Sequence, residues 1–144
     1  MSLPAAARAA LDAMPWVSIG RAKMRERGRY YHEHHAALLR SGLRGPAYFA
    51  ALMHELVHAE RGDQPCADAA SEAQQELAVA KEAARRLIDI RVLAEVAASF
   101  PDDPHRVAEE LDVDYETLAV RMRWLHPAER HYLRRRLACH EEIA

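Results

Sequence analysis

The chain changes character at Gly45-Pro46, and this change constrains the fold more than any other feature of the sequence. After this dipeptide, apolar residues recur at helical spacing, beginning with Tyr48, Leu52 and Leu56. Gly62 follows the run and is typical of a helix C-terminus. The pattern predicts an apolar helix from Gly45-Pro46 to Gly62, with further helices along the rest of the chain.

Residues 16–43, before this point, have the only texture typical of strands. Glycines at 20, 28 and 42 divide the stretch into short segments that contain tryptophan, valine, isoleucine, tyrosine and leucine. Short strands joined by turns fit this pattern better than a helix does. Residues 5–14 can form a short helix that Pro15 ends. We therefore expect any sheet to be small and close to the N-terminus.

The region after Gly62 predicts several helices separated by prolines and polar loops. One helix should begin at Asp68 or Ser71 and run to Ile88, and Ser71 and Gln74 have the spacing of a capping box. Further helices are expected at about 90–100, 105–111 and 115–125, and after Pro127. The expected fold class is α+β: one mostly helical domain with a small N-terminal β-sheet.

Composition excludes some broad classes of protein. The net charge of −2 over 144 residues gives no general attraction to nucleic acid or to a membrane surface. Cys66 and Cys139 lie far apart, which argues against a disulfide framework and fits a reducing compartment. No apolar run is long enough for a signal peptide or a membrane span. We expect a cytoplasmic protein without membrane association.

The segment His54-Glu55-Leu56-Val57-His58 is the most specific chemical signal in the chain. Histidines four residues apart lie on one face of a helix, and both imidazoles can reach one ion at roughly 2 Å. Glu55 is rotated away from that face, so it cannot easily be a ligand, but it can act as general base for the attacking water. The motif predicts a Zn²⁺ site with His54 and His58 as ligands.

A simpler explanation is a pair of histidines on an amphipathic helix, satisfied by neighbouring side chains. The apolar run 48–53 precedes the motif and predicts that its helix packs in the core. Buried histidines and a buried glutamate need strong partners, and a metal ion is one. The context therefore favours the metal site.

A zinc site of the catalytic type needs a third protein ligand, and spacing alone does not choose it. The acidic residues of the next helix are the best placed, because a helical hairpin brings that helix back past the first. The candidates are Asp63, Cys66, Asp68, Glu72, Glu76 and Glu82.

Several motifs together resemble the ImmA/IrrE family of metallopeptidases, in the compact form found in high-GC bacteria and their phages. They are the run from His54 to Asp63 (HELVHAERGD), Gly28–Tyr31 (GRYY) and Leu38–Leu43 (LLRSGL). The resemblance extends from about residue 28 to 137. It implies a glutamate ligand on the following helix, for which Glu76 is the nearest match and Glu82 the second. Ala80 departs from the family pattern, which usually has a polar residue there.

The resemblance also implies the activity. It implies a zincin-like zinc metallopeptidase, a hydrolase in which His54, His58 and Glu76 hold Zn²⁺ and Glu55 is catalytic. The implied substrate is a regulatory protein, such as a repressor or another DNA-binding regulator. The single domain would then comprise an N-terminal segment (about 1–27), the sheet with the metal-site helices (28–100), and C-terminal helices (101–144).

A non-catalytic binding protein is the alternative. It would grip a repressor, with zinc structural or absent, or bind DNA through residues 107–123, which have the rhythm of a helix-turn-helix. In that case Thr117, Arg121 and Arg123 would project from the second helix. Several acidic residues flank the turn and would repel phosphates, so we do not expect direct nucleic-acid binding.

Overall fold

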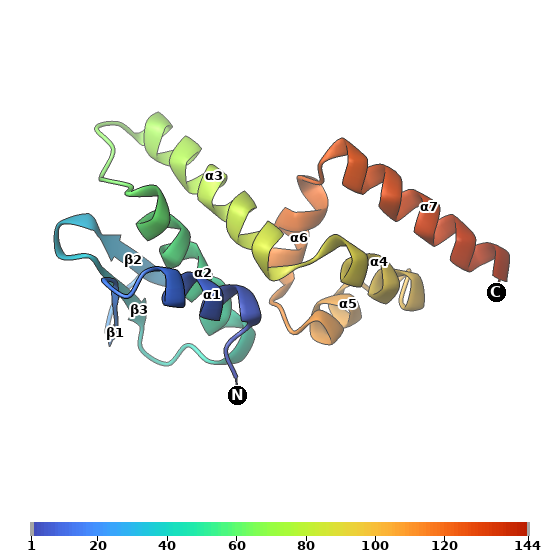
Figure 1. Cartoon of the computed structure of the whole chain (residues 1–144), viewed down its shortest axis with the longest axis horizontal. Coiled ribbons are helices and arrows are strands. Elements are labelled where there is room, and N and C mark those ends of the chain that lie inside the picture. Colours follow the sequence, from blue (N-terminus) through green and yellow to red (C-terminus); the bar gives the residue numbers. More distant parts are fainter. Residues whose placement is uncertain (1, 144) are drawn as a thin grey trace.

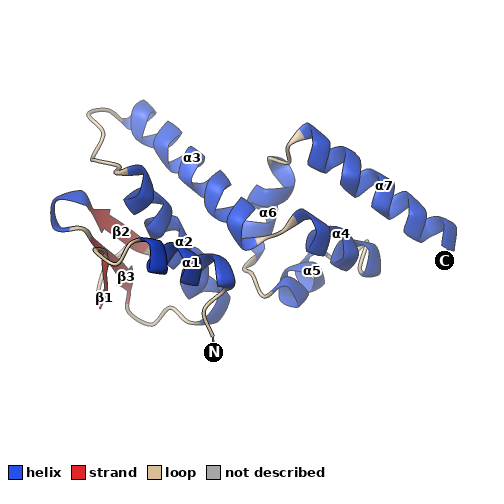
Figure 2. Cartoon of the chain, viewed as in Figure 1, coloured by secondary structure: helices blue, strands red, loops and turns tan. Residues whose placement is uncertain are grey.

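A computed structural model describes residues 2–143 and confirms the predicted fold class, a mostly helical α+β protein with a small sheet (Figures 1 and 2). Its helices and strands, in chain order, are α1 (Ala5–Ala13), β1 (Ser18–Ala22), β2 (Gly28–Tyr31), the 3₁₀ helix η1 (His32–His34), β3 (Ala36–Arg40), α2 (Gly45–Arg61), α3 (Ala69–Leu87), α4 (Ile90–Ser99), α5 (Pro104–Leu111), α6 (Tyr115–Arg123) and α7 (Pro127–Ile143). None of the described helices combines the length and apolarity that crossing a bilayer requires.

The sheet has the strand order β1-β3-β2, with β1 parallel and β2 antiparallel to the central strand β3. Along β3, Ala37 and Leu39 are buried, while Ala36, Leu38 and Arg40 are only partly covered. This alternation places one face of the strand against the core, where α2 packs on β2 and β3. Strand β2 therefore lies at an edge of the sheet and beside α2.

Helix α2 is the centre of the N-terminal core. Its buried residues occupy most of its circumference, as expected for a helix covered by α1, the sheet and α3. Leu52, Met53 and Leu56 are almost completely buried. Gly62 ends the helix in the left-handed conformation at φ 70°, which glycine adopts without steric cost. The predicted helix is confirmed, including its stop.

Helix α3 begins after Asp68, whose carboxylate accepts a hydrogen bond from the Ser71 backbone N–H at 2.8 Å. Of the two predicted starts, Asp68 is the observed one. The capping box predicted from Ser71 and Gln74 is wrong: the Ser71 hydroxyl donates to Asp68 instead, because Ser71 already lies in the first turn. The loop between the helices lets α3 return alongside α2 (Figure 1).

Within the described residues 2–143, the interior consists of two hydrophobic clusters. The first combines α1, β3, α2 and the middle of α3, and the second combines α4, α5, α6 and α7. Leu87, at the end of α3, packs against both clusters, and α6 also packs on α3. The observed packing differs from the expected subdivision in two ways. The sheet begins with β1, inside the segment 1–27 that was expected to precede it, and α4 packs with the C-terminal helices although it lies within 28–100. The change from one cluster to the other falls at Ile88.

Candidate metal centre

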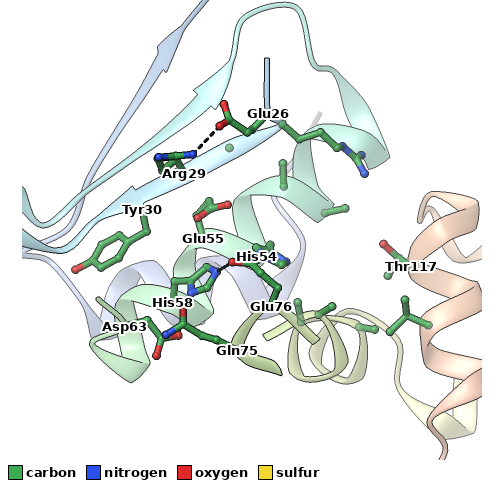
Figure 3. A pocket seen from close by; sticks show the side chains of 18 of the residues that line it. Glu26, Arg29, Tyr30, His54, Glu55, His58, Asp63, Gln75, Glu76 and Thr117 are labelled. Atoms are coloured by element: carbon green, nitrogen blue, oxygen red, sulfur yellow. Dashed lines mark hydrogen bonds and ion pairs between the residues drawn. The ribbon is translucent and has the colours of Figure 1, made fainter. Parts of the chain in front are cut away.

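Three side chains, two from α2 and one from α3, lie close together between these helices. The rings of His54 and His58 lie one helical turn apart, with centroids separated by 5.0 Å. The Glu76 carboxylate of α3 lies against both: Oε2 is 2.7 Å from His54 Nε2, and Oε1 is 2.9 Å from His58 Nε2 (Figure 3). Each residue offers a ligand atom, and these atoms lie within 4.8 Å of one another. This cluster could hold a metal ion.

The chemistry of the cluster fits zinc. Two imidazole nitrogens and one carboxylate oxygen are a donor set found in catalytic zinc sites, where three protein ligands leave a further position for water. Both histidines present the same nitrogen, Nε2, to the shared carboxylate. The three ligands predicted from the motif and the resemblance are therefore the ones that the structure brings together.

Asp63 fixes the orientation of His58 through the ring nitrogen that faces away from Glu76. Its Oδ2 atom lies 2.9 Å from His58 Nδ1, and Arg61 Nε donates to the same oxygen at 2.9 Å. The turn at Gly62 makes this contact possible, because it lets the Asp63 backbone N–H donate to the His58 carbonyl at 3.1 Å. A carboxylate on the far nitrogen of a histidine sets its tautomer and raises its basicity as a ligand. Asp63 thus supports the orientation of His58 and lies outside the cluster of His54, His58 and Glu76.

Hydrogen bonds within the cluster shift the pKa values of Glu76 and His58 toward their charged forms. Hydrogen bonds from His54 and His58 hold the pKa of Glu76 well below its usual value, against the opposing effect of burial. For His58, burial acts to lower the pKa, but hydrogen bonds to Glu76 and Asp63 outweigh it and the net pKa is raised. A cation at this position would meet a carboxylate that is already ionised.

Glu55 lies beside the cluster and is only 5% exposed. Figure 3 shows it between the histidines and the strand that carries Arg29 and Tyr30. Burial raises the pKa of the Glu55 carboxyl, although His54 and His58 pull it the other way. The approach of β2 depends on Gly28, since a Cβ there would lie 3.0 Å from Glu55 Cγ and 2.9 Å from Leu39 Cδ2.

The other candidate ligands are not part of the cluster. Glu82, the second choice for the third ligand, forms ion pairs with Arg85 and Arg86 at 2.5 and 2.8 Å. Those guanidinium groups, Arg85 first, lower the pKa of Glu82 to about 2. Cys66, Asp68 and Glu72 do not belong to the cluster. Glu76 therefore stands as the third member of the cluster.

A cleft of about 550 Å³ contains the cluster and Glu55. Its size is within the range of about 300–1,000 Å³ that is usual for ligand sites. Strand β2 forms one wall, α2 and α3 form others, and Glu116, Thr117 and Val120 of α6 close one end. The sequence did not reveal that α6 reaches the cleft, because nothing in a local pattern reports which helices meet.

The segment that resembles a helix-turn-helix forms α5 and α6, with Asp112 in the left-handed conformation between them. The prediction that Arg121 projects from the second helix is wrong. Its side chain is buried, donates to the Ile88 carbonyl at 2.9 Å and pairs with Glu129. Thr117 lines the cleft instead. Two of the three residues that the DNA-binding alternative would use, Thr117 and Arg121, therefore face the cleft or the interior.

The chain was compared with models of protein families, with curated proteins and with solved structures, and none of the three comparisons gave a match.

Proposed function

We propose that this chain is a zinc-dependent endopeptidase of the ImmA/IrrE type that cleaves a regulatory protein. The observation that carries the proposal is the position of Glu55, a buried carboxylate beside a cluster of two histidines and a glutamate in an open cleft. A structural metal site needs no such carboxylate next to it, whereas hydrolysis needs a base within reach of the attacking water.

His54, His58 and Glu76 would hold the zinc. A bound Zn²⁺ would supply Lewis-acid polarisation of the scissile carbonyl and a lowered pKa for water. The oxygen of the attacking water bonds to the carbonyl carbon, and Glu55 accepts the proton that this water loses. It then passes the proton to the amine when the C–N bond breaks.

Other features support the setting of this reaction. Cys66 and Cys139 are both free thiols, which agrees with the cytoplasmic location proposed here. The cleft is only partly enclosed and is lined by β2 and α3 on either side of the cluster, which leaves it accessible to part of a polypeptide substrate. The resemblance to the ImmA/IrrE family supports a repressor or another DNA-binding regulator as the substrate.

Two measurements test the proposal. The first is zinc content per chain for the wild type, Glu76→Ala and Glu82→Ala. We expect one zinc in the wild type and in Glu82→Ala, and loss of zinc in Glu76→Ala. Glu82→Ala is the matched control, because it removes a glutamate from the same helix without touching the cluster. Wild-type protein that takes up no zinc would contradict the proposal.

The second measurement is proteolysis. Zinc-loaded wild type and Glu55→Gln are each incubated with an extract of host-cell proteins, and newly formed N-termini are identified by mass spectrometry. We expect specific new N-termini with the wild type and a loss of at least about 100-fold with Glu55→Gln, with zinc retained. Zinc binding without any Glu55-dependent cleavage would contradict the peptidase and favour a non-catalytic binding protein.

A further inference from the structure

An exposed tryptophan marks a surface outside the cleft. Trp124 directly follows α6 and is 42% exposed. On α3, Leu77 is 40% exposed, and Lys81 lies one turn further along the same side of the helix. Lys81 Nζ lies 3.7 Å from the centroid of the Trp124 ring, and Arg123 Cζ lies 5.5 Å from it. The Trp124 patch is the surface formed by Leu77, Lys81, Arg123 and Trp124.

The positive charge of the Trp124 patch is not neutralised within the fold. Lys81 and Arg123 contact the aromatic ring, and within the described residues no carboxylate pairs with either of them. The acidic residues that follow or precede them in the chain, Glu82, Glu116 and Glu129, form ion pairs with other arginines. The net charge of the whole chain is −2, so the two free cations are a local feature of this surface.

The Trp124 patch borders the α6 end of the cleft. Ala80, which precedes Lys81, lines the cleft, and so does Val120, four residues before Trp124. Helix α6 packs on α3 between these positions. A protein bound to the patch would therefore have a neighbouring segment close to the cleft.

The surroundings of Trp124 favour a protein over a nucleic acid as the partner. A base stacks on a free face of an aromatic ring, and Lys81 already lies over one face of Trp124. The adjoining cleft carries carboxylates that would repel phosphates, those of Glu72, Glu76 and Glu116. Tryptophan and arginine are also the residue types that contribute most at contacts between proteins.

We propose that the Trp124 patch binds an acidic segment of a protein partner, in which a large apolar side chain is flanked by carboxylates. The apolar side chain would cover Leu77 and the remaining surface of the Trp124 ring, and the carboxylates would pair with Lys81 and Arg123. The proposal rests on the proposed function in one respect, that the partner is the protein to be cleaved. Binding at the patch itself requires neither zinc nor Glu55.

The test uses the fluorescence of Trp124 in the full chain with Trp16→Phe, which leaves Trp124 as the single tryptophan. Three peptides that differ only in charge are titrated: a Leu-Phe pair flanked on each side by two glutamates, by two lysines or by two serines, with both ends blocked. We expect the glutamate peptide to bind at least about tenfold more tightly than the other two, because it alone brings carboxylates to the free cations.

Charge reversal shows whether the two cations carry the preference. Lys81→Glu combined with Arg123→Glu should abolish the preference for the glutamate peptide and favour the lysine peptide instead. Lys23→Glu combined with Arg44→Glu is the matched control, because it makes the same change of charge at two exposed residues that do not line the cleft. The control should keep the preference of the wild type.

Leu77→Ala tests the apolar part of the patch and does not depend on the folding of the charge-reversed variant. Leu77 is exposed, so its truncation leaves the core untouched. We expect the glutamate peptide to bind about fivefold more weakly, the effect of truncating an apolar side chain that contributes to a contact. A preference that survives both Leu77→Ala and the charge reversal unchanged would overturn the patch as the binding site.

Measurements on metal-free and zinc-loaded protein separate this proposal from the peptidase. The glutamate peptide should bind equally well to both forms, and its binding to a chain that takes up no zinc would support the patch and contradict the peptidase. Equal binding of all three peptides, or binding of none, would overturn the patch and leave the zinc peptidase standing. A short oligothymidylate that binds more tightly than the glutamate peptide would overturn the protein partner in favour of a nucleic acid.

Discussion

The Nδ1 atom of His58 lies 2.9 Å from Oδ2 of Asp63, on the side of the ring opposite the metal cluster. The contact spans only five residues and depends on the turn at Gly62. It leaves Nε2 as the nitrogen that faces Glu76. His58 itself is only 6% exposed, so water cannot easily replace Asp63 as its partner.

We expect Asp63→Ala to weaken zinc binding by roughly 10–100-fold, the usual effect of removing a partner of a ligating histidine. The measurement is a competition titration with a chelator of known zinc affinity. Glu72→Ala is the matched control, because Glu72 also lines the cleft but lies outside the cluster. Equal zinc affinity for Asp63→Ala and the wild type would show that the contact does not support the site.

Gly28→Ala should reduce peptidase activity while leaving zinc content unchanged. The added methyl group would meet Glu55 and Leu39 at about 3 Å and push the carboxylate away from the attacking water. We expect a loss on the order of 100-fold, as for a small misplacement of a catalytic group. The readouts are cleavage rate and zinc stoichiometry.

Gly20→Ala is the control for this prediction. Gly20 lies on β1, and a Cβ there would approach only Leu38, at 3.1 Å. Activity should therefore be close to that of the wild type. If both variants lose activity equally, the cause is a general effect on the sheet and the specific contact with Glu55 is excluded.

Zinc should stabilise the folded chain. An ion that binds only the native state adds stability according to its free concentration, about 4 kcal/mol when this is 1,000 times the dissociation constant. We expect thermal unfolding to shift to higher temperature on adding zinc and to return on adding a chelator. Glu76→Ala should show little of this shift, and a shift as large as that of the wild type would argue that zinc binds elsewhere.

The pair between Arg121 and Glu129 should make the stability of the C-terminal helices depend on pH. Hydrogen bonds from Arg121 lower the pKa of Glu129 from 4.5 to about 2. Because the pKa is lower in the folded state, the pair stabilises the fold above pH 4.5 and this contribution is lost as the pH falls toward 2. The contribution is on the order of 3 kcal/mol at most.

Urea unfolding at several pH values between 2 and 6 measures this effect. Glu129→Gln should make the free energy of unfolding fall less steeply over that range than in the wild type. Glu109→Gln, which changes an exposed glutamate of α5, should leave the slope unchanged. An identical slope in the wild type and Glu129→Gln would exclude Glu129 as the group responsible.

Most of the secondary structure could be predicted because its signals are local. The helical spacing of Leu52 and Leu56, the stop at Gly62 and the glycines of the strand region each act over a few residues. The pairing of His54 with His58 is local in the same sense, since four residues of helix bring both rings to one face. The local signal allows two starts for α3, because Asp68 and Ser71 are both good capping residues.

The choice between the candidates for a third ligand needed the tertiary structure. Glu76 and Glu82 are six residues apart on α3, which corresponds to a rotation of about 240°. The helix pattern allows either one to face α2, and the packing of α3 on α2 decides. The structure turns Glu76 to the histidines and Glu82 to Arg85 and Arg86.

The sequence by itself thus determined the class of fold, the helix that carries His54, Glu55 and His58, and the side chains of α2 that could bind a metal ion. Only the tertiary structure decided that α6 closes the cleft, that Arg121 is buried and that Asp63 supports His58. The physical reason is the separation of the interacting residues along the chain, because hydrophobic periodicity and capping act within a few residues. Contacts such as that of Arg27 with Asp114 join segments 87 residues apart and depend on how the helices pack.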